Sequence, residues 1–346
     1  MIVGALTIEH CSTIIEPINV TPRRSNRMPY KVEVEWSPAY ELLTSLRAYL
    51  QFRGYGSTLE LRSDWSSAIR KRGGKELAEA IQAAGKVDVI DLLLWQSPSK
   101  ETVESALDWL GSLSRGEIID KLISFYSDCG RDVADGVPTK SVNDMTSMAT
   151  KWDKVVDLLS VWNKVYFSAI DPAIMDGLRK DAAEKRNLAA SMSPEDLIED
   201  ATFGVRLDPT EEEVRVLLIP QFHFRPWNIW KGGRGFALFS YPADVIPPQG
   251  GMPPQSVVRM TRALSDPNRL KILKAIASGA QSFTDVFGPS GLAKSTVHHH
   301  LMALRAAGLV RTRVPYPFGT APDRYSLRAG TLDTLADSLS AYLKEE

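Results

Sequence analysis

Apolar and polar positions alternate with different periods along the chain, and these periods predict many helices and a small sheet. Residues 31–36 alternate charged and apolar side chains, which is the period of a half-buried strand. Pro38 follows and is expected in the first turn of a helix, with leucines at helical spacing after it. The same spacing predicts further helices over 59–84, 99–126 and 144–168.

From residue 213 onward the apolar period changes from helical to extended. Residues 214–220 and 235–241 are expected to be buried strands, and Lys231–Gly235 a hairpin loop. Residues 241–254 contain five prolines and two glycines, which sustain neither a helix nor a central strand. We therefore expect a mostly helical N-terminal domain over 1–241, a linker over 242–255 and a second domain over 256–346.

The last 90 residues contain three helical patterns, a hairpin and a closing amphipathic helix. Asp266 and Pro267 fit an N-cap followed by proline in the first helical position. A short helix, a tight turn and a second helix with small polar and basic residues at its outward N-terminal end make a helix-turn-helix pattern. The sequence therefore predicts helices over 283–287, 293–307 and 331–344, and hairpin strands over 309–314 and 324–328.

The helix over 293–307 carries the candidate base-reading side chains. In helix-turn-helix geometry the second helix enters the major groove, and its first residues reach base edges. Serine, threonine, lysine and arginine bond bases or phosphates, and hairpin arginines most simply contact phosphate. The candidate DNA-binding residues are Lys294, Ser295, Thr296, His298, His299 and Arg305 on the helix, with Arg311, Arg313 and Arg324 on the hairpin.

Two stretches, Ala263–Leu273 and Gly291–Val310, resemble the ArsR-type winged helix-turn-helix regulators, and Arg324–Leu327 is similar to their second wing strand. The resemblance covers about a quarter of the chain. It implies a winged-helix fold, a homodimer, pseudo-palindromic operator DNA and a base-reading stretch within 294–299. In many members the first and last helices form the dimer interface, which would place Val257, Leu332, Leu335 and Leu339 there.

The sequence departs from this family in two main respects. Some members carry a cysteine pair for metal on the helix before the turn, and residues 256–346 contain no cysteine. The long N-terminal part is foreign to the small regulators. Its residues 33–50 more weakly resemble the body of a longer, little-characterised bacterial subgroup, whose signal is unknown.

The formal net charge of −1 hides an uneven distribution along the chain. Residues 256–346 hold 12 Lys and Arg against 7 Asp and Glu, whereas the preceding residues hold 29 against 35. A basic module on an acidic body indicates a polyanionic partner for that module, and a solvated basic face is the alternative.

The sequence argues against several other classes of protein. No apolar run approaches the length of a membrane span, and the first residues lack a basic flank and a cleavage site, so we expect a cytoplasmic protein with no membrane partner. Cys11 and Cys129 give no disulfide framework. Consecutive histidines at 298–300 point about 100° apart on a helix, so they cannot all face one ion and we expect no metal there. Familiar catalytic motifs and the dinucleotide fingerprint are absent from the sequence, so we expect no cofactor and no enzyme.

Residues 221–230 mix aromatic and polar side chains between two expected strands. Pockets are mainly apolar with a few polar groups, so this stretch is a candidate ligand site, and ordinary core packing is the alternative. The candidate ligand-binding residues are His223, Arg225, Trp227 and Trp230.

Together these features predict an α+β chain, mainly α with minor β, whose C-terminal domain is a winged helix-turn-helix. The main hypothesis is a dimeric repressor that binds double-stranded operator DNA and whose N-terminal domain senses a small-molecule effector or a partner. One alternative is a winged helix used for protein–protein contact. Another is an N-terminal enzyme fused to a regulatory DNA-binding domain.

Overall fold

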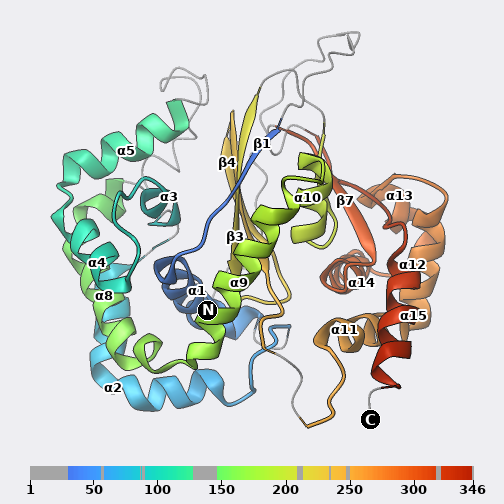
Figure 1. Ribbon diagram of the computed structural model, residues 1–346, viewed down its shortest axis with the longest axis horizontal. Helices are drawn as coiled ribbons and strands as arrows, with labels where there is room; N and C mark the ends of the chain where they lie inside the picture. Colours follow the sequence, from blue (N-terminus) through green and yellow to red (C-terminus); the bar gives the residue numbers. More distant parts are fainter. Residues whose placement is uncertain are drawn as a thin grey trace.

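The structure, a computed structural model, has the predicted α+β fold (Figure 1). It describes residues 30–55, 58–85, 87, 90–127, 146–208, 213–233, 235–246, 250–316 and 321–344. Both cysteines, Cys11 and Cys129, lie outside the described residues. None of the described helices is both long and apolar enough to cross a bilayer. We call residues 30–246 the body and residues 255–344 the winged-helix part.

A four-stranded sheet, which we call the body sheet, forms the centre of the body, in the order β1-β3-β5-β4. The first three strands are parallel, and β4 is antiparallel to β5. The parallel neighbours must be joined by crossovers, so helices are expected on the faces of the sheet. The strands are β1 (Tyr30–Val34), β3 (Val214–Gln221), β4 (Ile229–Gly233) and β5 (Phe236–Pro242).

Successive residues of β3 are buried on opposite faces of this sheet. Leu217 and Ile219 pack into the larger core with the helices up to α8, whereas Val216 and Leu218 pack into the core with the helices that follow. The body is therefore a three-layer arrangement. Its helices are α1 (Pro38–Tyr55), α2 (Trp65–Ala84), α3 (Ile90–Trp95), α4 (Val103–Ser112), α5 (Arg115–Ser127), α8 (Trp152–Val165), the 3-10 turn η1 (Phe167–Ala169), α9 (Pro172–Leu188) and α10 (Pro194–Ala201).

Several predicted boundaries in the body differ from the structure because local capping and turns override the apolar period. The helix predicted from residue 59 begins at Trp65, and the one predicted over 99–126 is two helices separated at Leu113, whose backbone is extended. The residues expected as a hairpin loop from Lys231 onward mostly belong to β4, and the chain reverses at Gly235, where φ is +84°. Helices α3, α9 and α10 were not predicted, although α9 and α10 each begin with a capping Asp or Ser followed by proline.

The winged-helix part contains the predicted helices and hairpin strands in the predicted order, together with a two-residue strand and a 3-10 turn that were not predicted. Its core gathers apolar side chains from α11, α12, α13, α14 and β7. The elements are α11 (Gln255–Leu264), α12 (Pro267–Ala277), β6 (Gln281–Ser282), α13 (Phe283–Phe287), the 3-10 turn η2 (Gly288–Ser290), α14 (Lys294–Ala306), β7 (Val310–Val314), β8 (Arg324–Leu327) and α15 (Thr331–Tyr342).

The second sheet combines strands from both parts of the chain. Its order is β2-β7-β8-β6, and β2 (Val205–Leu207) comes from the body. Strand β2 runs parallel to β7, with Val205 beside Thr312 and Leu207 beside Val314. Val314 is also buried in the core that α9 and α10 form with the body sheet. The predicted domain limits remain a prediction, and the structure adds a strand pairing that crosses them.

Candidate nucleic-acid interface

The helix-turn-helix is built by local signals that the sequence carries. Ser282 and Asp285 form a reciprocal capping box at the start of α13. Gly291 has φ +68° and Gly308 has φ +70°, left-handed conformations that glycine adopts without steric cost. These two glycines lie before and after α14, so they allow the sharp turns of the backbone at its two ends.

Helix α14 has one buried and one outward face, as its sequence predicts. Val297, Leu301 and Leu304 are buried in the core of the winged-helix part. On the other side Lys294, Ser295, His298 and His299 are exposed, while Thr296 and Arg305 are half-buried. The short polar and basic side chains at the helix start are therefore free of the core of the winged-helix part.

The three consecutive histidines have separate surroundings. His300 is 7% exposed, and its Nδ1 lies 3.8 Å from the Asp266 carboxylate without a hydrogen bond. Burial lowers the pKa of His298, and electrostatic interaction with Arg305 and His299 lowers it further. Over the described part of the chain, no group of three or more His, Cys, Asp or Glu side chains is placed to hold a metal ion.

The wing arginines differ in what they contact. Arg311 Nε lies 2.8 Å from Glu199 Oε1, and Arg313 Nε lies 3.6 Å from an oxygen of Asp208. Both carboxylates belong to the body. Arg324 is exposed and donates to the backbone oxygen of Ala280 within the winged-helix part. Two of the three predicted phosphate contacts, Arg311 and Arg313, are thus paired with body carboxylates in this arrangement.

A cleft of about 2050 Å³ lies between α14 and the body. In Figure 1, α14 lies between the body sheet and the pair α12 and α15. The Arg305 guanidinium stands 5.4 Å from the centre of the Trp230 ring, across the cleft. The cleft thereby brings together two sets of predicted site residues: Ser295, His298, His299 and Arg305 on one wall, with Arg225, Trp227 and Trp230 on the other.

Comparison with known proteins relates the C-terminal region to a known family. The model of the arsR family of bacterial regulatory proteins matches residues 266–312. The chain carries an ArsR-type helix-turn-helix. Its C-terminal region is therefore that of a DNA-binding transcriptional regulator. An ArsR-like transcriptional regulator from Rhodococcus sp. RHA1 is similar at 25% identity over 25% of this chain and 78% of that chain, with a TM-score of 0.23. No curated protein matches the chain.

The ligand candidates lie at different depths beside the ArsR-type domain. Trp230 is half-buried at the cleft, and Trp227 donates from Nε1 to the Thr58 hydroxyl at 3.1 Å. Arg225 is 6% exposed and bonds Asp244 at 3.2 Å, and burial lowers the pKa of its guanidinium. The charge of Arg225 is therefore already matched by a carboxylate of the body.

His223 does not line the cleft. It is 1% exposed, with Nδ1 2.5 Å from Glu41 Oε1 and Nε2 2.6 Å from the Tyr166 hydroxyl. Trp65 Nε1 donates to the same hydroxyl at 2.8 Å, and burial raises the pKa of Tyr166 to about 12. Both ring nitrogens of His223 are thus engaged by protein groups, which is the arrangement expected of a buried polar network.

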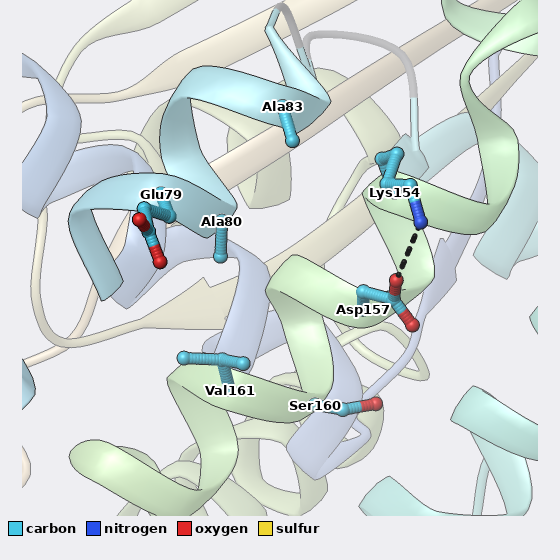
Figure 2. Close-up of a pocket in the computed structure, with 7 residues that line it drawn as sticks. All are labelled: Glu79, Ala80, Ala83, Lys154, Asp157, Ser160 and Val161. Carbon is cyan, nitrogen blue, oxygen red and sulfur yellow. Dashed lines mark hydrogen bonds and ion pairs between the residues drawn. The ribbon is translucent and has the colours of Figure 1, made fainter. Parts of the chain in front are cut away.

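A second, shallower pocket lies away from the ArsR-type domain, between α2 and α8 (Figure 2). It is about 400 Å³ in volume, and its lining Lys154 and Asp157 are paired at 3.3 Å. Small side chains such as Ala80 and Ala83 form the wall opposite them. All of the polar side chains that line it are exposed, so the pocket holds no buried polar group that would fix a ligand.

The sequence pattern did not indicate which residues of the body face the ArsR-type domain. Glu199 lies in α10 and Asp208 follows β2, and both pair with arginines more than 100 positions away. A carboxylate in a short amphipathic helix carries no local signal of such a partner. The excess of acidic residues in the body was the one feature that pointed to it.

Proposed function

We propose that the chain is a cytoplasmic, sequence-specific, dimeric transcriptional repressor. The observation that carries the proposal is the outward face of α14, where Lys294, Ser295 and His298 are exposed at the start of the second helix of an ArsR-type motif. These side chains reach base edges in the major groove, and Arg324 reaches phosphate. The proposal assigns the chain no catalytic step.

The dimer is proposed through the last helix. Leu332 on α15 is 50% exposed, Leu343 at its C-cap is 72% exposed, and Leu270 on α12 is 48% exposed. Exposed apolar side chains of this size on α12 and α15 are what a second copy would cover. Val257, which the resemblance assigns to that interface, is 4% exposed and already packs inside the chain. The dimer contact is therefore proposed to rest on α15 rather than on Val257.

The sensing role is proposed for the body, at the cleft that Trp227 and Trp230 line. Aromatic walls with a few polar groups suit a small organic effector. An effector changes DNA binding only if it binds the free and the DNA-bound conformations with different affinity. An effector bound between Trp230 and α14 would meet this condition, because it would also contact the DNA-reading face.

The test is a fluorescence-anisotropy titration of the full chain against its own upstream intergenic DNA, with unrelated DNA as the control, at two salt concentrations. We expect tighter binding to the upstream DNA and an affinity that falls steeply with salt. The double variant Lys294→Ala, His298→Ala should lose discrimination between the two DNAs while retaining the salt dependence. Equal, weak binding of both DNAs by the parent chain at every salt concentration would refute the proposal.

A second function is favoured by one observation, the packing of the wing on the body. Tyr316 follows β7, packs against the body core and donates to the backbone oxygen of Phe236 at 3.3 Å. A wing with such apolar contacts is suited to protein–protein contact. If the titration detects no specific DNA binding, affinity capture with the full chain would then be the next experiment, to find a protein partner of the winged-helix part.

A further inference from the structure

We propose that the body is an intramolecular docking surface for the DNA-reading face of its own winged-helix part, and that the docked arrangement keeps duplex DNA out. This inference rests on the proposed function and concerns the regulation of the same site. DNA binding then requires the winged-helix part to leave the body. Three observations carry the proposal: the position of α14, the shared sheet and the partners of the wing arginines.

The first observation is where the outward face of α14 points. Ser295, His298, His299, Met302 and Arg305 recur at helical spacing and all line the cleft, so they share one face of the helix. Trp230 closes the cleft opposite Arg305, at 5.4 Å from its guanidinium. A reading helix must enter a groove about 12 Å wide and about 8.5 Å deep, between two sugar-phosphate strands. The docked body occupies the space that this duplex would need.

The second observation is the backbone pairing between β2 and β7. The Thr312 amide donates to the Gly204 oxygen at 2.7 Å, and the Asp208 amide donates to the Val314 oxygen at 2.9 Å. Val205, Leu207 and Val314 are each at most 4% exposed, so the contact is dry as well as hydrogen-bonded. A wing held by buried strand pairing is not simply resting against the body.

The third observation is that body carboxylates already pair with arginines of the wing. Glu199 is 6% exposed and lies 2.8 Å from Arg311 and 3.6 Å from Arg328. Asp208 lies 3.6 Å from Arg313. The planar guanidinium group suits carboxylate and phosphate alike, and one group cannot serve both at full strength. Each of these pairs must therefore loosen before its arginine can contact DNA.

A further contact holds the other end of the winged-helix part. Arg259 of α11 is 10% exposed in its side chain and lies 2.9 Å from Glu60 of the body. It also pairs with Asp244, which precedes the connecting segment. The winged-helix part is thus fixed to the body at α11 as well as at β7, on both sides of the cleft.

The test locks the docked arrangement with a disulfide in the full chain. Val205→Cys and Thr312→Cys are introduced together with Cys11→Ser and Cys129→Ser, since residues 205 and 312 are paired neighbours. Strands about 4.8 Å apart bring Cα atoms within the range that a disulfide spans. We expect the reduced protein to bind its upstream DNA, the oxidised protein to bind at least about tenfold more weakly, and reductant to restore binding, because locking removes the competent population.

A matched control keeps the same cysteine and moves its partner into the winged-helix part. Thr312→Cys with Tyr325→Cys joins β7 to β8, which are paired at these positions, and leaves the body free. Its oxidised and reduced forms should bind DNA alike. Equal binding by the oxidised and reduced Val205→Cys, Thr312→Cys protein, with the cross-link verified by mass spectrometry, overturns the docking proposal and leaves the proposed function standing. Absence of specific binding in the reduced protein and in the parent chain overturns both.

A second variant tests the same proposal without a cross-link. Glu199→Gln removes a charge that Arg311 and Arg328 of the wing share with Arg206 of the body, so the docked state weakens and DNA affinity should rise several-fold. Glu76→Gln removes one negative charge from an exposed pair with Lys164 on the far side of the body and should leave affinity unchanged. An equal rise of DNA affinity in both variants would show that the change in net charge alone causes it, and would contradict docking through Glu199.

Discussion

At the scale of single residues, the wing arginines differ in the protein groups that compete with DNA phosphate for them. Arg311 is bound to the buried carboxylate of Glu199, whereas Arg324 is exposed and donates to the backbone oxygen of Ala280. An arginine that must leave a hydrogen-bonded carboxylate before it contacts phosphate contributes less net affinity than one whose hydrogen-bond partner is a backbone carbonyl oxygen. Substitution of Arg324 therefore tests phosphate contact alone, whereas substitution of Arg311 tests phosphate contact together with release from the body.

Arg324→Ala should weaken binding to all DNA sequences and lower the salt slope by about 1, because one phosphate contact is lost. Arg311→Ala should lower the slope similarly but change affinity less, because it also weakens the docked state. Anisotropy titrations at four or more salt concentrations measure both quantities. Equal losses of affinity in the two variants would indicate that the Glu199 contact does not compete with DNA.

His298 gives the DNA interaction a predicted pH dependence. Burial and neighbouring positive charge hold the pKa of His298 below its usual value, so the free protein carries it neutral at pH 7. A nearby phosphate favours the charged form, so complex formation takes up a proton, and affinity should increase as the pH falls from about 7 towards that lowered pKa. Titrations between about pH 7.5 and pH 5.5 measure this increase, and His298→Gln should flatten it.

At the scale of elements, the short strand β2 depends on one glycine. Gly204 has φ +123°, and a Cβ there would lie 2.5 Å from the carbonyl oxygen of Val310 in β7. The backbone of the body therefore approaches the wing more closely than any side chain permits. Glycine is required here by close approach as well as by conformation.

Gly204→Ala should push β2 away from β7 and so destabilise the docked state. We expect a lower unfolding midpoint together with tighter binding to DNA, because the loss falls mainly on the docked arrangement. Gly279→Ala is a matched control, since φ there is +147° and nothing lies within 4 Å of an added Cβ. The control should share part of the thermal loss without the gain in affinity. Weaker DNA binding by Gly204→Ala than by Gly279→Ala would contradict the expected opening.

At the scale of the whole molecule, an acidic body and a basic winged-helix part are joined by one sheet. The charge distribution suits two partners for the basic part, the body in one state and DNA in the other. The proposed docked and DNA-bound arrangements exclude each other and so make a two-state element, which the effector proposed for the cleft would bias.

Hydrogen exchange should report the transition between these arrangements. In the free protein the amides of Thr312 and Asp208 are bonded across β2 and β7 and should exchange slowly. Adding the upstream DNA should speed their exchange, because the pairing opens. The amide of Arg215, bonded to Gly235 within the body, should keep its rate. Increased protection at Thr312 and Asp208 on DNA binding would indicate that the docked sheet persists in the complex.

The sequence by itself determined the helix-turn-helix, because its signals are local. Asp266 caps α12, Ser282 and Asp285 cap α13, and the glycines around α14 end and redirect the chain within a few residues. The apolar spacing of α14 assigned its buried and outward faces correctly. Such signals act over one or two helical turns, so they can be recognised without knowledge of the rest of the fold.

The tertiary structure alone decided what the outward face of α14 meets. Strand β2 has three residues, too few for a period, and its partner lies more than 100 positions away. The parallel order of the body sheet, the burial of His223 between Glu41 and Tyr166, and the pairing of Glu199 with Arg311 are contacts between distant segments. Their energy depends on packing and desolvation at one place in space, which local residue patterns do not encode.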